Sequence, residues 1–87
     1  LVVNDPVVHD KMADLYARNE LWTEAVREYE SAINQTTNEV FAMRMGRRLI
    51  QILRIMNNDQ GIGRVREALA TRWPDSDLLP VPEESRP

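Results

Sequence analysis

The apolar residues of segment 22–33 recur at a spacing that fits a single kind of backbone. They fall at i, i+3, i+4, i+7, i+10 and i+11, at Trp22, Ala25, Val26, Tyr29, Ala32 and Ile33. This is one continuous stripe along an α-helix of about 3.6 residues per turn, whereas a half-buried strand would alternate every second residue. We therefore expect a helix over about 21–35 that buries one face.

A second helix is expected before this one, over about 6–19. It opens with Asn4-Asp5-Pro6, and an Asn or Asp cap followed by proline is a start signal. Asn19-Glu20 interrupts its apolar pattern. Because only two or three residues join the two helices, we expect them to pack as antiparallel neighbours.

Two further helices are expected in the second half of the chain. Thr36 and Glu39 have the spacing of a capping box and predict a helix over about 38–56. Its apolar seam is Ala42, Met45, Gly46, Leu49, Leu53 and Met56. Asn57-Asn58-Asp59 then predicts the start of a fourth helix, which Trp73-Pro74 ends.

The chain length allows one domain, which we place at 1–79 with a proline-rich extended or disordered tail at 80–87. The 87 residues contain no cysteine, which excludes disulfides and thiolate metal sites. No apolar run approaches the ~20 residues of a membrane span. The first residue is Leu1 rather than methionine, and we expect the sequence to be a piece of a longer chain.

A helical turn is expected from Ser76, and Leu78-Leu79 is expected to dock on the last helix.

The two helix pairs repeat each other weakly. Met12-Ala13-x-x-Tyr16 matches Met45-Gly46-x-x-Leu49 after 33 residues, and the pattern Ala25, Tyr29, Ala32, Ile33 matches Gly61, Val65, Ala68, Leu69 after 36. With two helices per unit and a period near 34, the sequence resembles the tetratricopeptide repeat family. The match is specific over about 6–38 and degenerate over about 39–74. An ordinary four-helix arrangement is the alternative.

The resemblance implies an all-α fold of two stacked antiparallel hairpins, 6–35 and 38–73, forming a fragment of a right-handed superhelix. It also implies a non-catalytic protein–protein interaction or scaffold module that binds a peptide or helix in a concave groove lined by the first helix of each hairpin. The side chains carried over to that groove are Asp10, Asp14, Met43, Arg47, Ile50 and Arg54.

Charge is distributed unevenly, with a net charge of −3 overall but seven arginines against two acids in residues 41–72. One interpretation is that Arg47 and Arg54 orient an acidic or C-terminal peptide. The other is that Asp10 and Asp14 pair with arginines of the third helix. The family's carboxylate clamp uses lysine and asparagine in this groove, so the acids at Asp10 and Asp14 argue against chaperone-tail binding.

Two other functions stay open at this point. Two repeats are few for a solenoid, so the last hairpin is expected to self-associate, giving a homo-oligomer. Nucleic-acid binding through the arginine-rich third helix is a minor alternative, opposed by the pI of about 5.1 and by the flanking acids.

Catalytic chemistry has little basis in this sequence. His9 is the single histidine, Asp5 is better explained as a cap, and neither Ser31 nor Ser76 has a base nearby. We therefore expect no enzyme activity, no metal and no cofactor. The tryptophans, tyrosines and methionines are expected in the core, with Met43 as the exception that faces the groove.

Overall fold

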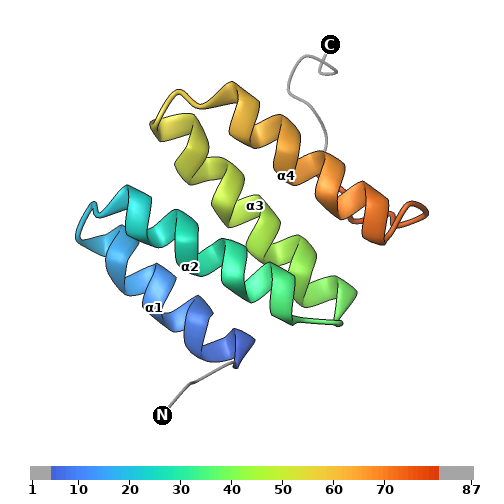
Figure 1. The fold of residues 1–87 in the computed structure, drawn as a ribbon, viewed down its shortest axis with the longest axis horizontal. Helices are drawn as coiled ribbons and strands as arrows, with labels where there is room; N and C mark the ends of the chain where they lie inside the picture. The colour runs from blue at the N-terminus through green and yellow to red at the C-terminus, as the bar shows by residue number, and fades with distance from the viewer. Residues whose placement is uncertain (1–4, 81–87) are drawn as a thin grey trace.

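The computed structural model describes residues 5–80, which form four α-helices and, within that range, no strand. In chain order they are α1 (Pro6–Arg18), α2 (Trp22–Gln35), α3 (Glu39–Ile55) and α4 (Asp59–Arg72), shown in Figure 1. Each predicted helix is confirmed to within one residue at each end. The all-α class follows from apolar spacing alone, because every stripe has the helical period.

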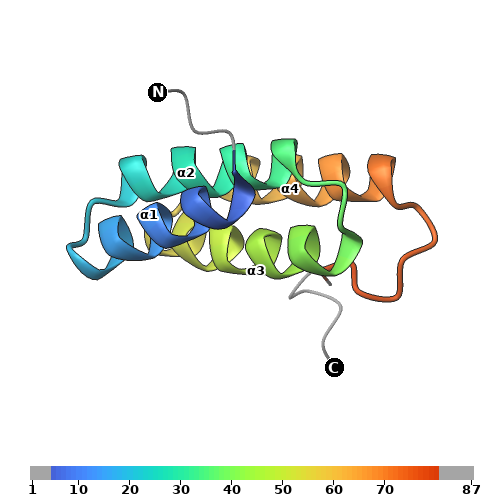
Figure 2. The ribbon, with the colours of Figure 1, turned by 90° about the horizontal axis from the view of Figure 1, so that it is seen from below.

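Successive helices pack against each other as antiparallel neighbours, and the four form two layers. Figure 2 shows α1 and α3 in one layer and α2 and α4 in the other. Since α3 contacts both α2 and α4, it is the central helix and buries eight of its 17 residues.

Short polar side chains begin three of the helices. Asp5 accepts a hydrogen bond from the Val7 amide at 2.9 Å, Asn38 from the Phe41 amide at 2.9 Å, and Asn58 from the Gly61 amide at 2.9 Å. These satisfy amides that have no partner within the helix.

The capping box expected between Thr36 and Glu39 is wrong. Asn38 caps α3 instead, and the Thr36 hydroxyl accepts from the Asn38 amide at 3.1 Å. Thr36 is itself buried at the end of α2, and the Glu39 carboxylate accepts from the Ser76 hydroxyl at 2.6 Å. Both Thr36 and Asn38 are residue types that cap helices. Asn38 directly precedes the first residue of α3, so its side chain takes the cap.

The two hairpins turn in the same way. At the end of α1, Glu20 has φ 58°, and the Leu21 amide donates to the Tyr16 carbonyl at 2.9 Å. At the end of α3, Asn57 has φ 56°, and the Asn58 amide donates to the Leu53 carbonyl at 2.8 Å. Both ends are Schellman motifs with a non-glycine residue in the left-handed position.

Small side chains lie at the helix crossings, as predicted. Ala13, Ala25 and Ala32 are fully buried, and a Cβ built on Gly46 would lie 2.6 Å from Leu69 Cδ1. A side chain at position 46 would therefore require the Leu69 side chain to shift. The largest fully buried side chains are Met43, Met45, Leu49 and Leu69.

The correspondence between the two hairpins fails at Ala68. Its counterpart Ala32 is fully buried because α2 packs against both α1 and α3, whereas α4 packs against α3 and leaves Ala68 exposed. Met12 and Met56 are also exposed, so the prediction of an all-core methionine set is wrong for these two.

Residues 73–80, called here the C-terminal strap, leave the end of α4 and cross onto α3. The helical turn expected at Ser76 is not formed: the segment consists of turns, and the Ser76 hydroxyl accepts from the Leu78 amide at 3.1 Å. Leu78 and Leu79 are partly buried against the core, and Arg47 of α3 donates to the Leu78 carbonyl at 2.6 Å. The tail expected at 80–87 lies, from residue 81 onward, outside the described residues.

Candidate functional site

The six residues expected in a groove between α1 and α3 do not form an open surface. Met43 and Ile50 are 0% and 3% exposed and belong to the hydrophobic core. An interior side chain cannot contact a peptide without unfolding of its surroundings, so the expectation that Met43 faces a groove is wrong. The reason is the central place of α3, whose apolar residues are covered on more than one side.

The acids of α1 are used within the chain. The Arg48 guanidinium donates to the Asp10 carboxylate at 3.1 Å, which links α3 to α1, and Arg18 pairs with Asp14 at 2.9 Å one turn along the same helix. Burial raises the pKa of the Tyr29 phenol beside this group, Arg48 opposes the rise, and Asp10 and Asp14 add to it. Asp10 thus pairs with an arginine of the third helix, which was the second of the two interpretations, whereas Asp14 pairs within its own helix.

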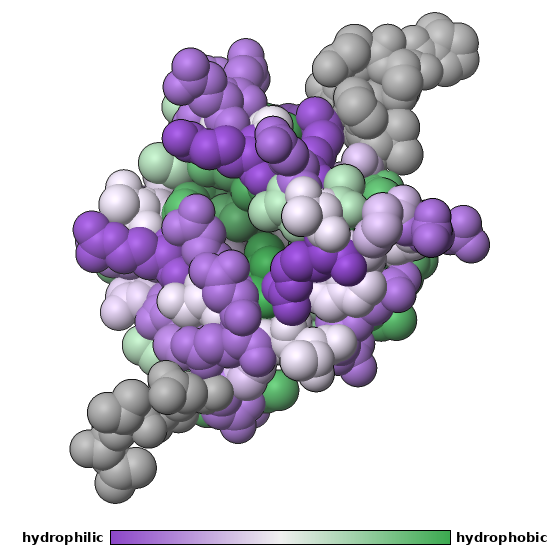
Figure 3. Space-filling view, turned by 45° about the vertical axis from the view of Figure 1, so that its right-hand side comes forward, coloured by the Kyte–Doolittle hydropathy of each residue, from purple (hydrophilic) through white to green (hydrophobic). Residues whose placement is uncertain are grey.

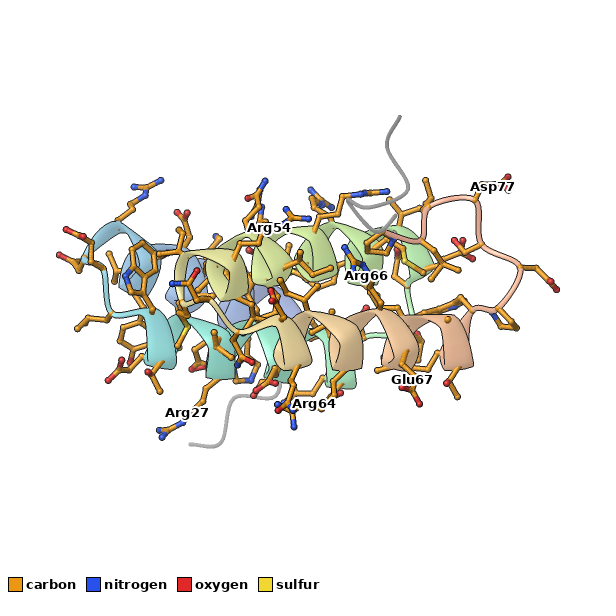
Figure 4. All side chains as sticks on the ribbon, turned by 90° about the horizontal axis from the view of Figure 1, so that it is seen from above. Arg27, Arg54, Arg64, Arg66, Glu67 and Asp77 are labelled. Atoms are coloured by element: carbon orange, nitrogen blue, oxygen red, sulfur yellow. The ribbon has the colours of Figure 1, made fainter. Side chains whose placement is uncertain are left out.

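The basic side chains of this face are also engaged. Arg47 is held by the Leu78 carbonyl of the strap, Arg44 lies over the Phe41 ring at 5.8 Å, and Arg54 is half-buried with an interaction of its own. Figure 4 shows Arg54 on the α3 side of the molecule, away from α2 and α4. Each of these three arginines therefore has a contact within the chain, and Arg47 lies against the strap.

An open apolar groove lies on the opposite face, between α2 and α4. It has a volume of about 550 Å³. Val26 of α2 and Ala68 of α4 are its accessible apolar side chains. Beneath them the groove is lined by buried residues, which are at most 9% exposed: Ile33, Leu49, Leu53, Val65 and Leu69. Figure 3 shows this as an apolar hollow ringed by hydrophilic side chains.

The rims of the groove carry opposite charges. Glu30 and Asn34 stand on the α2 rim, and Arg64 stands on the α4 rim. All three are exposed, and neither Glu30 nor Arg64 forms an ion pair within residues 5–80. In Figure 4, Arg27 and Arg64 project outward from the α2/α4 layer. The groove can thus bury apolar side chains of a partner, while the charged rims favour opposite charges along the edges of that partner.

Arg72 holds the two walls together at one end. Its guanidinium donates to the Ile33 carbonyl at 2.6 Å and to the Thr36 carbonyl, both at the C-terminal end of α2, and lies over the Trp73 ring at 4.2 Å. The last carbonyls of a helix have no partner within it and carry partial negative charge, so a cation is favoured there. The spacing of α2 and α4 is therefore set by a direct link as well as by packing on α3.

Sequence reasoning missed the groove because it aligned the two hairpins too closely. In the first hairpin, His9 of α1 pairs with Glu28 of α2 at 2.8 Å. The positions that correspond in the second hairpin are Ala42 and Arg64, which cannot pair. This missing pair was the available signal that Arg64 has no partner on α3 equivalent to His9 and is exposed.

Metal and membrane sites receive no support among the described residues. His9 bonds to Glu28 and Gln35, and residues 5–80 contain no cluster of three or more histidine or carboxylate side chains able to hold a metal ion. In the same range, no helix combines the length and apolar character needed to cross a bilayer.

Comparison with known proteins was made at three levels: no family model, no curated protein sequence and no solved structure matches this chain.

Proposed function

We propose that this chain is a non-catalytic protein–protein interaction module whose groove between α2 and α4 accepts an amphipathic helix of a partner. The observation that carries the proposal is the hollow itself, in which Val26 of α2 and Ala68 of α4 are accessible on either side. A helix laid in such a groove buries residues spaced at i, i+3, i+4 and i+7 along one face.

The rim charges define the chemistry of the occupant. A carboxylate at Glu30 favours a cationic edge on the α2 side, and a guanidinium at Arg64 favours an anionic edge on the α4 side. Because both rims are exposed, these pairs would set the direction of the bound helix more than its affinity, which would come from the apolar face.

The resemblance to tetratricopeptide repeats belongs to the same proposal. It is supported by two hairpins that end their first helix in the same left-handed turn and by the small residues at their crossings. The peptide groove of the family, between α1 and α3, is not proposed here, because Met43 and Ile50 are interior and Arg47 is held by the strap.

Nucleic-acid binding is not carried forward. The Arg48 guanidinium is paired with the Asp10 carboxylate, and the pI of the chain is about 5.1, both of which disfavour contact with a phosphate backbone.

The test uses a designed helix as the probe. A short stapled peptide with leucines at i, i+4 and i+7, lysines along one edge and glutamates along the other is labelled and titrated with the protein. We expect binding by fluorescence anisotropy, with amide shifts in NMR spectra at Val26, Val65 and Ala68. Ala68→Glu, which places a charge on the groove wall, should weaken binding at least about tenfold.

Thr71→Glu is the matched control, since Thr71 is exposed on the same helix but outside the groove. It should leave binding unchanged. A peptide with its two charged edges exchanged should bind more weakly. Binding that shifts the amides of Arg47 and Arg54 instead, or equal binding by the Ala68→Glu protein, would overturn the proposal.

A further inference from the structure

Helix α1 has a second apolar face that residues 5–80 cover only in part. Its inner side packs through Ala13, while Met12 and Leu15 are 38% and 61% exposed. With half-buried Val8 they form an outward stripe at i, i+4 and i+7. An amphipathic helix therefore lies on the surface of the same chain that carries a groove for one.

The edge of this stripe carries the charge that the groove selects. At about 100° per residue, Lys11 lies along one side of the line through Val8 and Leu15, and Arg18 on the same side is paired with Asp14 at 2.9 Å. Lys11 forms no ion pair within residues 5–80, and Glu30 on the α2 rim likewise forms none. The outward face of α1 thus combines an apolar stripe with one cation, Lys11, that is unpaired among the described residues and suits the Glu30 carboxylate of the α2 rim.

We propose that the outward face of α1 of one copy docks in the α2/α4 groove of a second copy, with Lys11 toward Glu30. This rests on the proposed function, because it names α1 as a helix that the groove accepts. The stripe is on the outer side of α1 and the groove is between α2 and α4, so each copy has one donor face and one acceptor face (Figure 1). After one such head-to-tail contact, one copy still has a free groove and the other still has a free α1 face. The assembly can therefore lengthen as the concentration rises.

The test follows the mass of the 87-residue chain by sedimentation velocity over a wide range of concentrations. We expect association that increases with concentration. Leu15→Asp removes the donor face, and Ala68→Glu removes the acceptor face, so each variant alone should be monomeric. Val40→Asp is the matched control, because Val40 is 60% exposed against 61% for Leu15 but lies at the start of α3, outside both faces. Circular dichroism verifies that all variants are folded.

Mixing the two variants gives the sharper result. Leu15→Asp keeps an intact groove and Ala68→Glu keeps an intact α1 face, so an equimolar mixture should form a heterodimer that grows no further. A symmetric interface made by one patch twice cannot give this outcome. A mixture that stays monomeric, or association that survives either single variant, would overturn the proposal.

The designed stapled helix separates this proposal from the proposed function. If the wild-type chain stays monomeric while the stapled helix still binds in the groove, self-assembly through α1 is wrong and the interaction function stands. If neither associates with the groove, both are wrong.

Discussion

The close contact between Gly46 of α3 and Leu69 of α4 makes a quantitative prediction. Gly46 and Gly63 are both helical glycines, so replacing either with alanine removes the same helical penalty of about 1 kcal/mol. Their surroundings differ. A Cβ at Gly63 meets nothing within 4 Å, whereas a Cβ at Gly46 would lie 2.6 Å from Leu69 Cδ1.

The expected effects follow from these distances. Gly63→Ala should raise the free energy of unfolding by about 0.5–1 kcal/mol. In Gly46→Ala, Leu69 must withdraw by about 0.8 Å to restore an ordinary 3.4 Å contact, and Leu69 is fully buried. Overpacking of this kind costs about 1–3 kcal/mol. Gly46→Ala should therefore be less stable than Gly63→Ala by that amount, and Gly46→Val less stable still.

Urea denaturation followed by far-UV circular dichroism measures these differences. In a domain of this size, each kcal/mol also corresponds to about 4–8 °C in Tm. A double-mutant cycle adds a second measurement: Leu69→Ala should be less destabilising in the Gly46→Ala background, with a coupling of about 0.5–3 kcal/mol. Equal stabilisation by Gly46→Ala and Gly63→Ala would refute the close contact of α3 with α4.

Three further predictions address the helix ends and the buried phenol. Arg72→Ala should lower the free energy of unfolding by about 1–3 kcal/mol in urea denaturation, because two charge-assisted hydrogen bonds to α2 are lost; the control Arg64→Ala should change it by less than about 0.5 kcal/mol. Glu20→Gly should raise Tm, since glycine adopts the positive φ of this turn without the strain of about 1 kcal/mol that a side chain brings; an unchanged or lower Tm would contradict this. The pKa of Tyr29 is raised above 10.0, so the folded chain binds this proton more tightly than the unfolded chain. Its contribution is present below about pH 10 and is lost as pH rises through the folded pKa. In alkaline denaturation series, Tyr29→Phe should lose less stability above that pH than the wild type; parallel curves would disagree.

A small part of the charge asymmetry of the sequence is balanced within the fold. The acidic first hairpin and the basic third helix meet where Arg48 donates to Asp10, and Arg72 donates to carbonyls of α2. Surface pairs of this kind contribute little to stability, typically up to about 1 kcal/mol. Contacts within the chain also engage charged side chains that the sequence alone assigned to a partner. Arg47, which was expected to orient a bound peptide, instead donates to the Leu78 carbonyl.

The helices and their order are determined by the sequence by itself. Apolar residues at helical spacing, together with Asp5, Asn58 and Pro74, define each helix to within a residue, because these signals act within one or two turns of the backbone. The small residues Ala13, Ala25 and Gly46 also identified the crossings correctly, since only a small side chain permits close approach.

The surface that remains open was decided only by the tertiary structure. Met43 and Met12 are the same residue type on helices of similar pattern, yet Met43 is buried under neighbours and Met12 is exposed at the edge. Ala32 and Ala68 likewise occupy matching places in the repeat, and only Ala32 is covered. The burial of a side chain depends on which helix packs against its face and on the rotation of the two helices about their axes. The spacing of apolar residues within one helix determines neither of these.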